Sequence, residues 1–180
     1  MSYYATIVTT LGVLALAAVA LALGLGTMLA LPAGRAGLRG ALAGQERHVN
    51  GWAWGVSLTA MLGSLYLSEI AHLLPCSLCW YQRIAMYPLV FVLGAGLLRR
   101  DAGVWRFAIP LPVIGLLIAI YHVTIQWRPT LDVGTCTTGA PCTGRYLAVF
   151  GFISIPTMAA AAFLLITVLL LLVRTLEREG

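Results

Sequence analysis

The chain has 180 residues, of which 61% are hydrophobic and only 9% charged, and its formal net charge is +5. Soluble domains carry about 25% charged residues, so the composition excludes an ordinary soluble domain and predicts an integral membrane protein. The positive charge comes from 11 arginines without any lysine. Because no basic stripe is interleaved with aromatic residues, nucleic-acid binding is not expected.

The first predicted element is an uncharged apolar segment over residues 5–31. A transmembrane helix needs roughly 20 apolar residues, so this segment is long enough to cross a bilayer. A signal peptide begins with a positive region, and its apolar core has roughly 7–15 residues. Residues 1–4 carry no positive side chain. We therefore predict a retained membrane helix within residues 1–34 rather than a cleaved signal.

Four further spans follow along the chain. The second is interrupted only by Glu69 and His72, and the third is so short that it should begin near Trp80, which draws Arg83 into its first turn. The last contains Pro156, which predicts a kink, because neighbouring helices can form hydrogen bonds with the backbone groups that a proline leaves free. The four ranges are 51–74, 84–98, 104 to about 125, and 146–173. The fold class expected is an all-α membrane bundle.

The arginines predict how the bundle is oriented. Three arginines, Arg83, Arg128 and Arg145, lie on one side of the predicted spans. Eight flank the connections on the other side: Arg35, Arg39, Arg47, Arg99, Arg100, Arg106, Arg174 and Arg178. The positive-inside rule makes the eight-arginine side cytoplasmic, with the N-terminus outside and the C-terminus inside. All four cysteines then lie outside the cytoplasm, where disulfides persist.

Cys76 and Cys79 form a Cys-x-x-Cys motif directly after Pro75, where the third span begins. We expect both thiols in the exposed first turn of that helix, where the macrodipole lowers thiol pKa values. Arg83 follows Cys79 by four residues and shares its helix face. Its guanidinium could stabilise a Cys79 thiolate or bind an acceptor oxygen beside it. The alternative is that Arg83 only reaches the lipid headgroups.

Cys136 and Cys142 lie in a polar loop over residues 126–145 that is rich in Thr, Gly and Pro. A disulfide here would close a small ring in a mobile, water-accessible segment that a soluble partner could reach. Exchange requires a thiolate to attack a disulfide sulfur, and a flexible loop could carry one pair to the other. The two pairs favour an electron relay, and a structural staple for the loop is the alternative.

Four cysteines could also bind zinc. Cys-x-x-Cys is half of a common zinc site, but the second pair is spaced Cys-x5-Cys. An oxidising compartment also competes against reduced thiolates. We therefore expect no metal.

Three other polar residues are candidates. Glu69 and His72 form one Glu-x-x-His, whereas a carboxylate di-iron bundle needs that motif twice with further glutamates. We expect this pair to face the bundle interior and to assist proton movement. His122, near the outer end of the fourth span, lies at a depth similar to Arg83 and could hydrogen-bond a bound headgroup. The alternative is an ordinary interfacial histidine.

Two segments carry a family resemblance: residues 66–70 (Tyr-Leu-Ser-Glu-Ile) and 75–88 (Pro-Cys-Ser-Leu-Cys-Trp-Tyr-Gln-Arg-Ile-Ala-Met-Tyr-Pro). They resemble the DsbB disulfide-oxidoreductase family, particularly its BdbC-like branch. The resemblance implies a four-helix membrane bundle over residues 51–175 with an extracytoplasmic loop, 126–145, and makes the helix within 1–34 additional. It also implies a bacterial inner-membrane enzyme that oxidises a DsbA-like thioredoxin-fold partner and reduces a membrane quinone, menaquinone or ubiquinone.

The resemblance also assigns roles to individual residues. Cys136 would form the mixed disulfide with the partner, and Cys142 would resolve it and attack Cys76. Cys79 would then be released as the thiolate that meets the quinone, whose oxygen Arg83 would hold, with His122 nearby. The chain departs from the enterobacterial pattern in its closely spaced loop cysteines and in its additional first span.

Two other classes of function remain as alternatives. An enzyme resembling vitamin K epoxide reductase also pairs a Cys-x-x-Cys with loop cysteines, but there the loop pair precedes the motif. A non-enzymatic membrane scaffold would carry two inert structural disulfides. An electron donor that feeds reductant outward carries the same motif, so the motif alone does not predict the net direction of electron flow. The oligomeric state and the identity of the quinone are not predicted either.

Overall fold

The computed structural model describes residues 2–134, 136 and 140–177, and it is helical almost throughout. Among these residues the only β feature is an isolated bridge between Val149 and Ile153. The helices in chain order are α1 (Ser2–Ala30), α2 (Pro32–Leu42), α3 (Glu46–Leu65), the π-helix η1 (Tyr66–Ile70), α4 (Ser77–Arg99), the 3-10 helix η2 (Ala102–Val104), α5 (Trp105–Ala108), α6 (Pro110–Trp127), the 3-10 helix η3 (Pro129–Leu131) and α7 (Ile155–Glu177). The all-α fold is confirmed.

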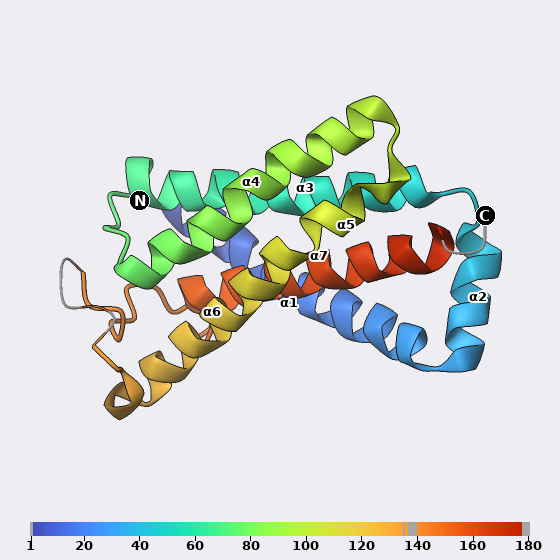
Figure 1. Cartoon of the computed structure of the whole chain (residues 1–180). Coiled ribbons are helices and arrows are strands. Elements are labelled where there is room, and N and C mark those ends of the chain that lie inside the picture. Colours follow the sequence, from blue (N-terminus) through green and yellow to red (C-terminus); the bar gives the residue numbers. More distant parts are fainter. Residues whose placement is uncertain (1, 135, 137–139, 178–180) are drawn as a thin grey trace.

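The long helices run lengthwise through the molecule, and α2 crosses them at one end (Figure 1). Within the described residues, four helical segments are long and apolar enough to cross a membrane: Tyr3–Ala30, Ser77–Arg99, Trp105–Trp127 and Ile155–Glu177. The second predicted span is not among them. Helix α3 occupies its place in the bundle, but its first turns carry Glu46, Arg47, His48 and Asn50, which lower its hydropathy.

Helix α7 is the centre of the bundle and packs against α1, α3 and α6. Its buried side chains, among them Phe163, Ile166 and Leu170, contribute more residues to the main hydrophobic core than those of any other helix. Gly115 of α6 lies directly against the Phe163 ring, which leaves no room for a Cβ at position 115. Small residues at helix contacts are typical of membrane bundles, because they let the backbones approach closely.

Two helix boundaries differ from those predicted. Helix α7 begins at Ile155, so the predicted kink at Pro156 is wrong: this proline lies in the first turn, where its missing N–H costs no hydrogen bond. Residues 146–154 form the loop and bridge that precede α7. Helix α4 begins at Ser77, three residues earlier than Trp80, because Cys76 caps it. Arg83 therefore lies in the second turn of the helix.

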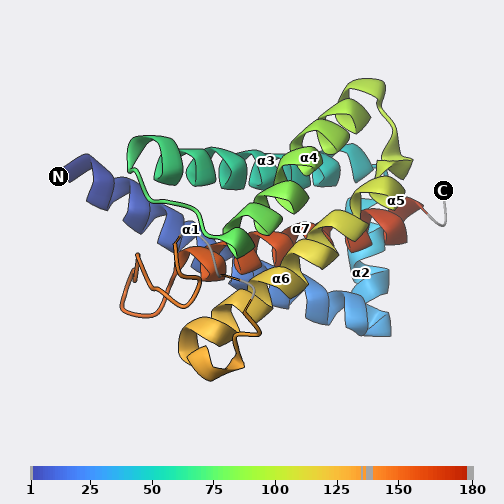
Figure 2. The ribbon, with the colours of Figure 1, turned by 60° about the vertical axis from the view of Figure 1, so that its left-hand side comes forward.

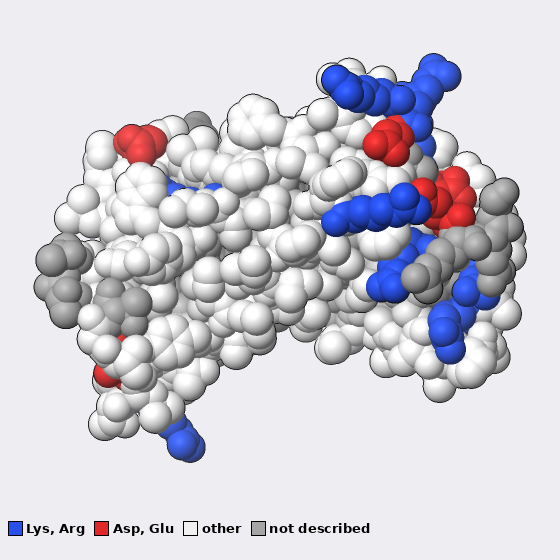
Figure 3. All heavy atoms as spheres, in the orientation of Figure 1, with Lys and Arg blue, Asp and Glu red and all other residues white. Residues whose placement is uncertain are grey.

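The two ends of the bundle differ in charge. Figure 3 shows most of the visible arginine atoms at the end formed by α2, the α4–α5 connection and the end of α7. Arg178, one of the eight arginines assigned to this side, lies outside the described residues. The start of α1 and the loop that follows α6 lie together at the opposite end (Figure 2). That second end contains the cysteines.

Candidate functional site

The Cys-x-x-Cys motif forms the start of α4. Cys76 is the N-cap residue, with φ −77° and ψ 173°, and its sulfur accepts a hydrogen bond from the Cys79 backbone N–H at 3.4 Å. The two sulfurs lie 2.9 Å apart, and neither forms a disulfide. Cys76 is only 3% exposed, whereas Cys79 is half-buried. The expectation that both thiols occupy an exposed turn is therefore wrong, because the later loop covers Cys76.

His122 of α6 joins the two cysteine pairs. Its Nε2 lies 3.7 Å from Cys76 Sγ and 3.1 Å from the Cys142 carbonyl oxygen. The Gln82 side-chain amide lies 3.1 Å from His122 Nδ1. Because an amide nitrogen can only donate, a neutral ring carries its proton on Nε2, which donates to Cys142. His122 is 2% exposed, so it is a buried link between the pairs and not an ordinary interfacial histidine.

The second pair forms a disulfide between Cys136 and Cys142, with 5.8 Å between the Cα atoms. Cys142 is 1% exposed and Cys136 is half-buried. Both pack with Cys76 and Cys79 in one small hydrophobic cluster that includes Ile125. The expectation of a wholly water-accessible pair is wrong for Cys142, which the fold has already brought to the first pair. Residues 137–139 of this loop lie outside the described residues.

Gln126 of α6 holds the far side of the loop in place. Its side-chain nitrogen donates to the Gly144 carbonyl at 3.2 Å, and its side-chain oxygen accepts from Ser154 at 2.7 Å. Together with His122, these contacts attach the loop to α6 at Cys142 and at the residues that follow it. The burial of Cys142 follows from this attachment.

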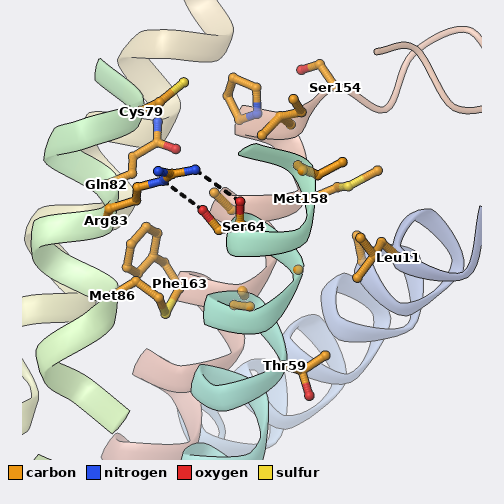
Figure 4. Close-up of a pocket in the computed structure, with 18 of the residues that line it drawn as sticks. Leu11, Thr59, Ser64, Cys79, Gln82, Arg83, Met86, Ser154, Met158 and Phe163 are labelled. Atoms are coloured by element: carbon orange, nitrogen blue, oxygen red, sulfur yellow. Dashed lines mark hydrogen bonds between the residues drawn. The ribbon is translucent and has the colours of Figure 1, made fainter. Parts of the chain in front are cut away.

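Arg83 points into the bundle rather than toward the headgroups. Its Nε donates to Ser64 Oγ at 2.9 Å, and one terminal nitrogen donates to the Ser64 carbonyl oxygen at 3.0 Å (Figure 4). The Tyr87 hydroxyl donates to the same Oγ at 3.4 Å, and Trp80 lies with its ring centre 5.1 Å from the guanidinium carbon. Ser64 lies just before η1, and π-helical turns recur at functional sites.

A cavity of about 560 Å³ adjoins Cys76 and Cys79 and reaches Pro141 and Gly144 of the loop that carries the second pair. Its lining is mainly aliphatic, with polar side chains such as Ser64, Gln82 and Arg83 gathered at the cysteine end (Figure 4). Ligand sites have this character: a mostly apolar cleft with a few convergent polar groups. Cys79 and His122 also line it. The cavity therefore suits an apolar molecule that carries an acceptor oxygen for Arg83.

The two thiols of the reduced Cys76–Cys79 pair do not ionise equally. The hydrogen bond with the Cys79 side chain is the main reason why the pKa of Cys76 falls to about 4, and His122 and the Cys79 backbone N–H act in the same direction. Burial opposes them. A thiolate at a helix N-cap also gains from the helix dipole. Cys76 is thus the sulfur that holds charge when the pair is reduced.

Two other groups of residues were considered from the sequence. Glu69 and His72 are both exposed, and His72 has a φ of 54° just after η1, so the expectation that they face the bundle interior is wrong. The ligand atoms of Cys76, Cys79 and His122 lie within 4.8 Å of one another. A structural zinc site needs four ligands, and among the described residues no fourth His, Cys, Asp or Glu joins this group.

The sequence interpretation missed Gln82 and Ser64. Gln82 had a weak signal, since it is a polar residue within the apolar third span and only three residues after Cys79. Ser64 had none, because its partner Arg83 is 19 residues away along the chain. The structure brings all six predicted site residues to one end of the bundle, with His122 against Cys76 and Arg83 against Ser64.

Comparison with known proteins places the site in a family context. The family model described as "Disulfide bond formation protein DsbB" matches residues 46–173. "Probable disulfide formation protein C 2" of Bacillus anthracis is 51% identical over 118 residues, which are 66% of this chain and 84% of that protein. "Disulfide bond formation protein C" of Bacillus subtilis is 46% identical over 128 residues, 71% of this chain and 93% of that protein. No solved structure matches the chain.

Proposed function

The chain belongs to the DsbB family of disulfide bond formation proteins, and from this premise we propose that it reoxidises a DsbA-like thioredoxin-fold protein and passes the electrons to a membrane quinone. One observation carries the proposal. His122 contacts both Cys76 and the Cys142 carbonyl, so the two cysteine pairs meet beside a cavity that contains Arg83. The thiols of a reduced partner could therefore react at the loop disulfide, while an apolar electron acceptor in the cavity reacts with Cys76 and Cys79.

The exchange with the partner begins at the loop disulfide. A partner thiolate attacks Cys136 and releases Cys142 as a thiolate, and the partner's second thiol then displaces Cys136. The partner leaves oxidised, and the loop pair holds its two electrons. Cys136 suits the first attack because it is the more exposed member of the pair.

The electrons then pass to the motif at the start of α4. The Cys142 thiolate attacks Cys76 of a Cys76–Cys79 disulfide and releases Cys79, after which Cys136 attacks Cys142 and restores the loop disulfide. The product has a loop disulfide and free thiols at Cys76 and Cys79, which is the arrangement described above. His122 and Gln82 hold Cys76 and the Cys142 backbone together for this step.

The residues of the cavity fit a quinone, either menaquinone or ubiquinone. When bound, such a group accepts two electrons and two protons. Cys76 and Cys79 would supply both electrons as they re-form their disulfide. The Cys79 thiol would supply one proton, and the solvent would supply the second, because Cys76 is already a thiolate. Arg83, held by Ser64, would donate a hydrogen bond to a ring oxygen, and the mainly aliphatic lining would surround the ring with apolar side chains. Cys79, which lies on the same helix face as Arg83, would be the sulfur next to the acceptor.

Energetics set the direction of flow. DsbA-like oxidants have a potential of about −120 mV, and for two electrons about 30 mV corresponds to roughly 1.4 kcal/mol. A disulfide of ordinary stability cannot regenerate so strong an oxidant. Continuous removal of electrons from Cys76 and Cys79 by the quinone pool would draw the exchange forward.

The orientation in the membrane is part of the proposal. Arginines gather at the end opposite to the cysteines, which favours a cytoplasmic location for that end. The N-terminus and the cysteine loop would then lie outside the cytoplasm of a bacterial cell, where a thioredoxin-fold oxidase works.

The test is an anaerobic assay in detergent with a reduced DsbA-like protein and a soluble quinone analogue. We expect quinol, followed by absorbance, in step with the partner's disulfide, and no quinol from the Cys76→Ser variant. Absence of quinol from folded wild-type protein with a competent partner would overturn the proposal. Resistance of both pairs to mild reductant would instead point to a scaffold with inert disulfides.

A further inference from the structure

Helix α1 lies outside the matched family segment, 46–173, but it is built into the site. Val8 packs in one buried cluster with Leu67 of η1 and with Val149 and Ile153 of the loop before α7. At Gly12 a Cβ would lie 2.8 Å from Val149 Cγ1, so the glycine permits this close contact. The first half of α1 is therefore seated against the cysteine end of the bundle.

After these contacts, α1 continues along α7, and the cavity extends between α1, α3 and α7. Figure 4 shows Leu11 of α1 facing the cavity from the side opposite Arg83. The same cavity reaches Leu25 of α1 and Leu169 of α7. Leu11 and Leu25 are 14 positions apart, about 21 Å along a helix at 1.5 Å per residue. A ring bound beside Arg83 would fill only the cysteine end of so long a space.

The far part of the cavity is lined mainly by small and aliphatic side chains, together with Trp52 and Thr59 of α3, and the Thr59 hydroxyl donates to the Gly55 carbonyl oxygen of its own helix. Ala15 and Ala18 of α1 face it, as does Gly55 of α3. A Cβ at Gly55 would meet no atom within 4 Å, so the wall is open at this point. The polar groups Arg83 and Ser64 are confined to the other end.

We propose that α1 forms the outer wall of a channel that holds the isoprenoid tail of the quinone. This inference rests on the proposed function, since the ring must lie beside Arg83 and Cys79 for its tail to follow the cavity. The occupant is a long apolar chain, because the lining offers no partner for charged or hydrogen-bonding groups along α1. The continuity of the cavity with the site of Arg83 favours the quinone tail over an acyl chain of a membrane lipid.

Two matched pairs of variants test the channel in the full-length protein. Gly55→Leu fills open space in the wall, and Gly51→Leu, one turn earlier on α3, is its control: a Cβ there also meets no atom within 4 Å, and Gly51 does not line the cavity. Ala18→Leu narrows the channel from α1, with Ala20→Leu on the exposed face as its control.

We expect the KM for a long-tailed quinone to rise roughly tenfold in Gly55→Leu and Ala18→Leu, since small changes of shape in an apolar pocket have effects of this size. The KM for an analogue with a methyl group in place of the tail should not change. Both controls should match the wild type with both quinones. An equal loss with both quinones, or no loss with either, would overturn the proposal.

Photolabelling gives a readout that does not depend on turnover. The probe is a long-tailed quinone with a diazirine at the far end of its tail, and labelled peptides are identified by mass spectrometry. We expect labels in residues 21–25 of α1 that unlabelled long-tailed quinone prevents. Labels confined to α4 or α6 would overturn the proposal, as would α1 labels that only phospholipid prevents. If the wild type reduces neither quinone, the proposed function fails. Whether unlabelled long-tailed quinone prevents the α1 labels still tests the channel in that case.

Discussion

Arg83 on α4 and Ser64 on α3 are joined by two hydrogen bonds, one to the serine hydroxyl at 2.9 Å and one to its carbonyl oxygen at 3.0 Å. The guanidinium is thus fixed at the polar end of an otherwise apolar cavity. Its position depends on a residue of another helix, and this dependence can be tested separately from its charge.

Replacement of Ser64 by Ala should weaken quinone use without affecting the partner. The variant keeps the carbonyl acceptor but loses the hydroxyl, and a hydrogen bond to a charged group is worth about 1.5–3 kcal/mol. Because the lost bond orients Arg83 and does not itself hold the quinone, only part of this free energy should affect the KM, which we expect to rise about tenfold, with kcat nearly unchanged. Ser64→Thr, which retains the hydroxyl, should restore the wild-type value. A fall in kcat with unchanged KM would contradict a positioning role.

Arg83→Ala removes the cation itself. We expect the KM for quinone to rise by about 10- to 100-fold, because a charge-assisted hydrogen bond is lost. Disulfide exchange between the loop and the partner, measured by gel shift without quinone, should remain close to wild type. Arg83→Lys should recover only part of the loss, since an ammonium cannot reproduce the two directed bonds to Ser64. Unchanged quinone kinetics in Arg83→Ala would show that Arg83 does not bind the quinone.

The partner should attach to Cys136 and not to Cys142, because Cys142 is 1% exposed. A DsbA-like protein that retains only its attacking cysteine is mixed with the oxidised protein, and the adduct is mapped by mass spectrometry. We expect the linkage at Cys136. The Cys136→Ala variant, which lacks the loop disulfide, should give no adduct at the loop. A main adduct at Cys142 would reverse the proposed order of exchange.

The thiolate of Cys76 should persist into acid. Its pKa is lowered from 9.0 to about 4, so the charged form contributes stability that is fully present above pH 9 and is lost as the pH falls through about 4. Ultraviolet absorbance of the reduced protein should show one thiolate at pH 6. In Cys79→Ala, which removes the largest cause of the shift, that thiolate should titrate at higher pH. His122→Ala should move it less. A single step near pH 9 in the wild type would contradict this.

Gly115 should be intolerant of a side chain. Its Cβ position is occupied by the Phe163 ring, which is fully buried. Overpacking of a core costs about 1–3 kcal/mol, so Gly115→Val should lower the unfolding temperature in detergent. Gly24→Ala is the control, because a Cβ there meets no atom within 4 Å, and it should not lower that temperature. Gly115→Ala should also lower the unfolding temperature, and adding Phe163→Leu to it should recover part of that loss. Equal stability of Gly115→Val and wild type would show that α6 and α7 can separate locally.

Local features of this protein could be read from its sequence. The spans follow from long apolar segments, and the shared face of Cys79 and Arg83 follows from the helical repeat. The Cys-x-x-Cys motif and its resemblance to DsbB proteins rest on one continuous segment. Even so, the observed starts of α4 and α7 differ from the predicted ones, because the cap at Cys76 and the position of Pro156 depend on the conformation of the residues that precede each helix.

The tertiary structure alone decided which of these parts meet. His122 lies 46 residues after Cys76 and 20 before Cys142, and Ser64 lies 19 before Arg83. No local pattern encodes such pairs, since they arise from how α3, α4, α6 and the loop pack. The burial of Cys142 and the place of α1 along the cavity have the same origin. Composition and periodicity determined the class of protein and its reactive segment, whereas long-range packing determined the geometry through which the segment can act.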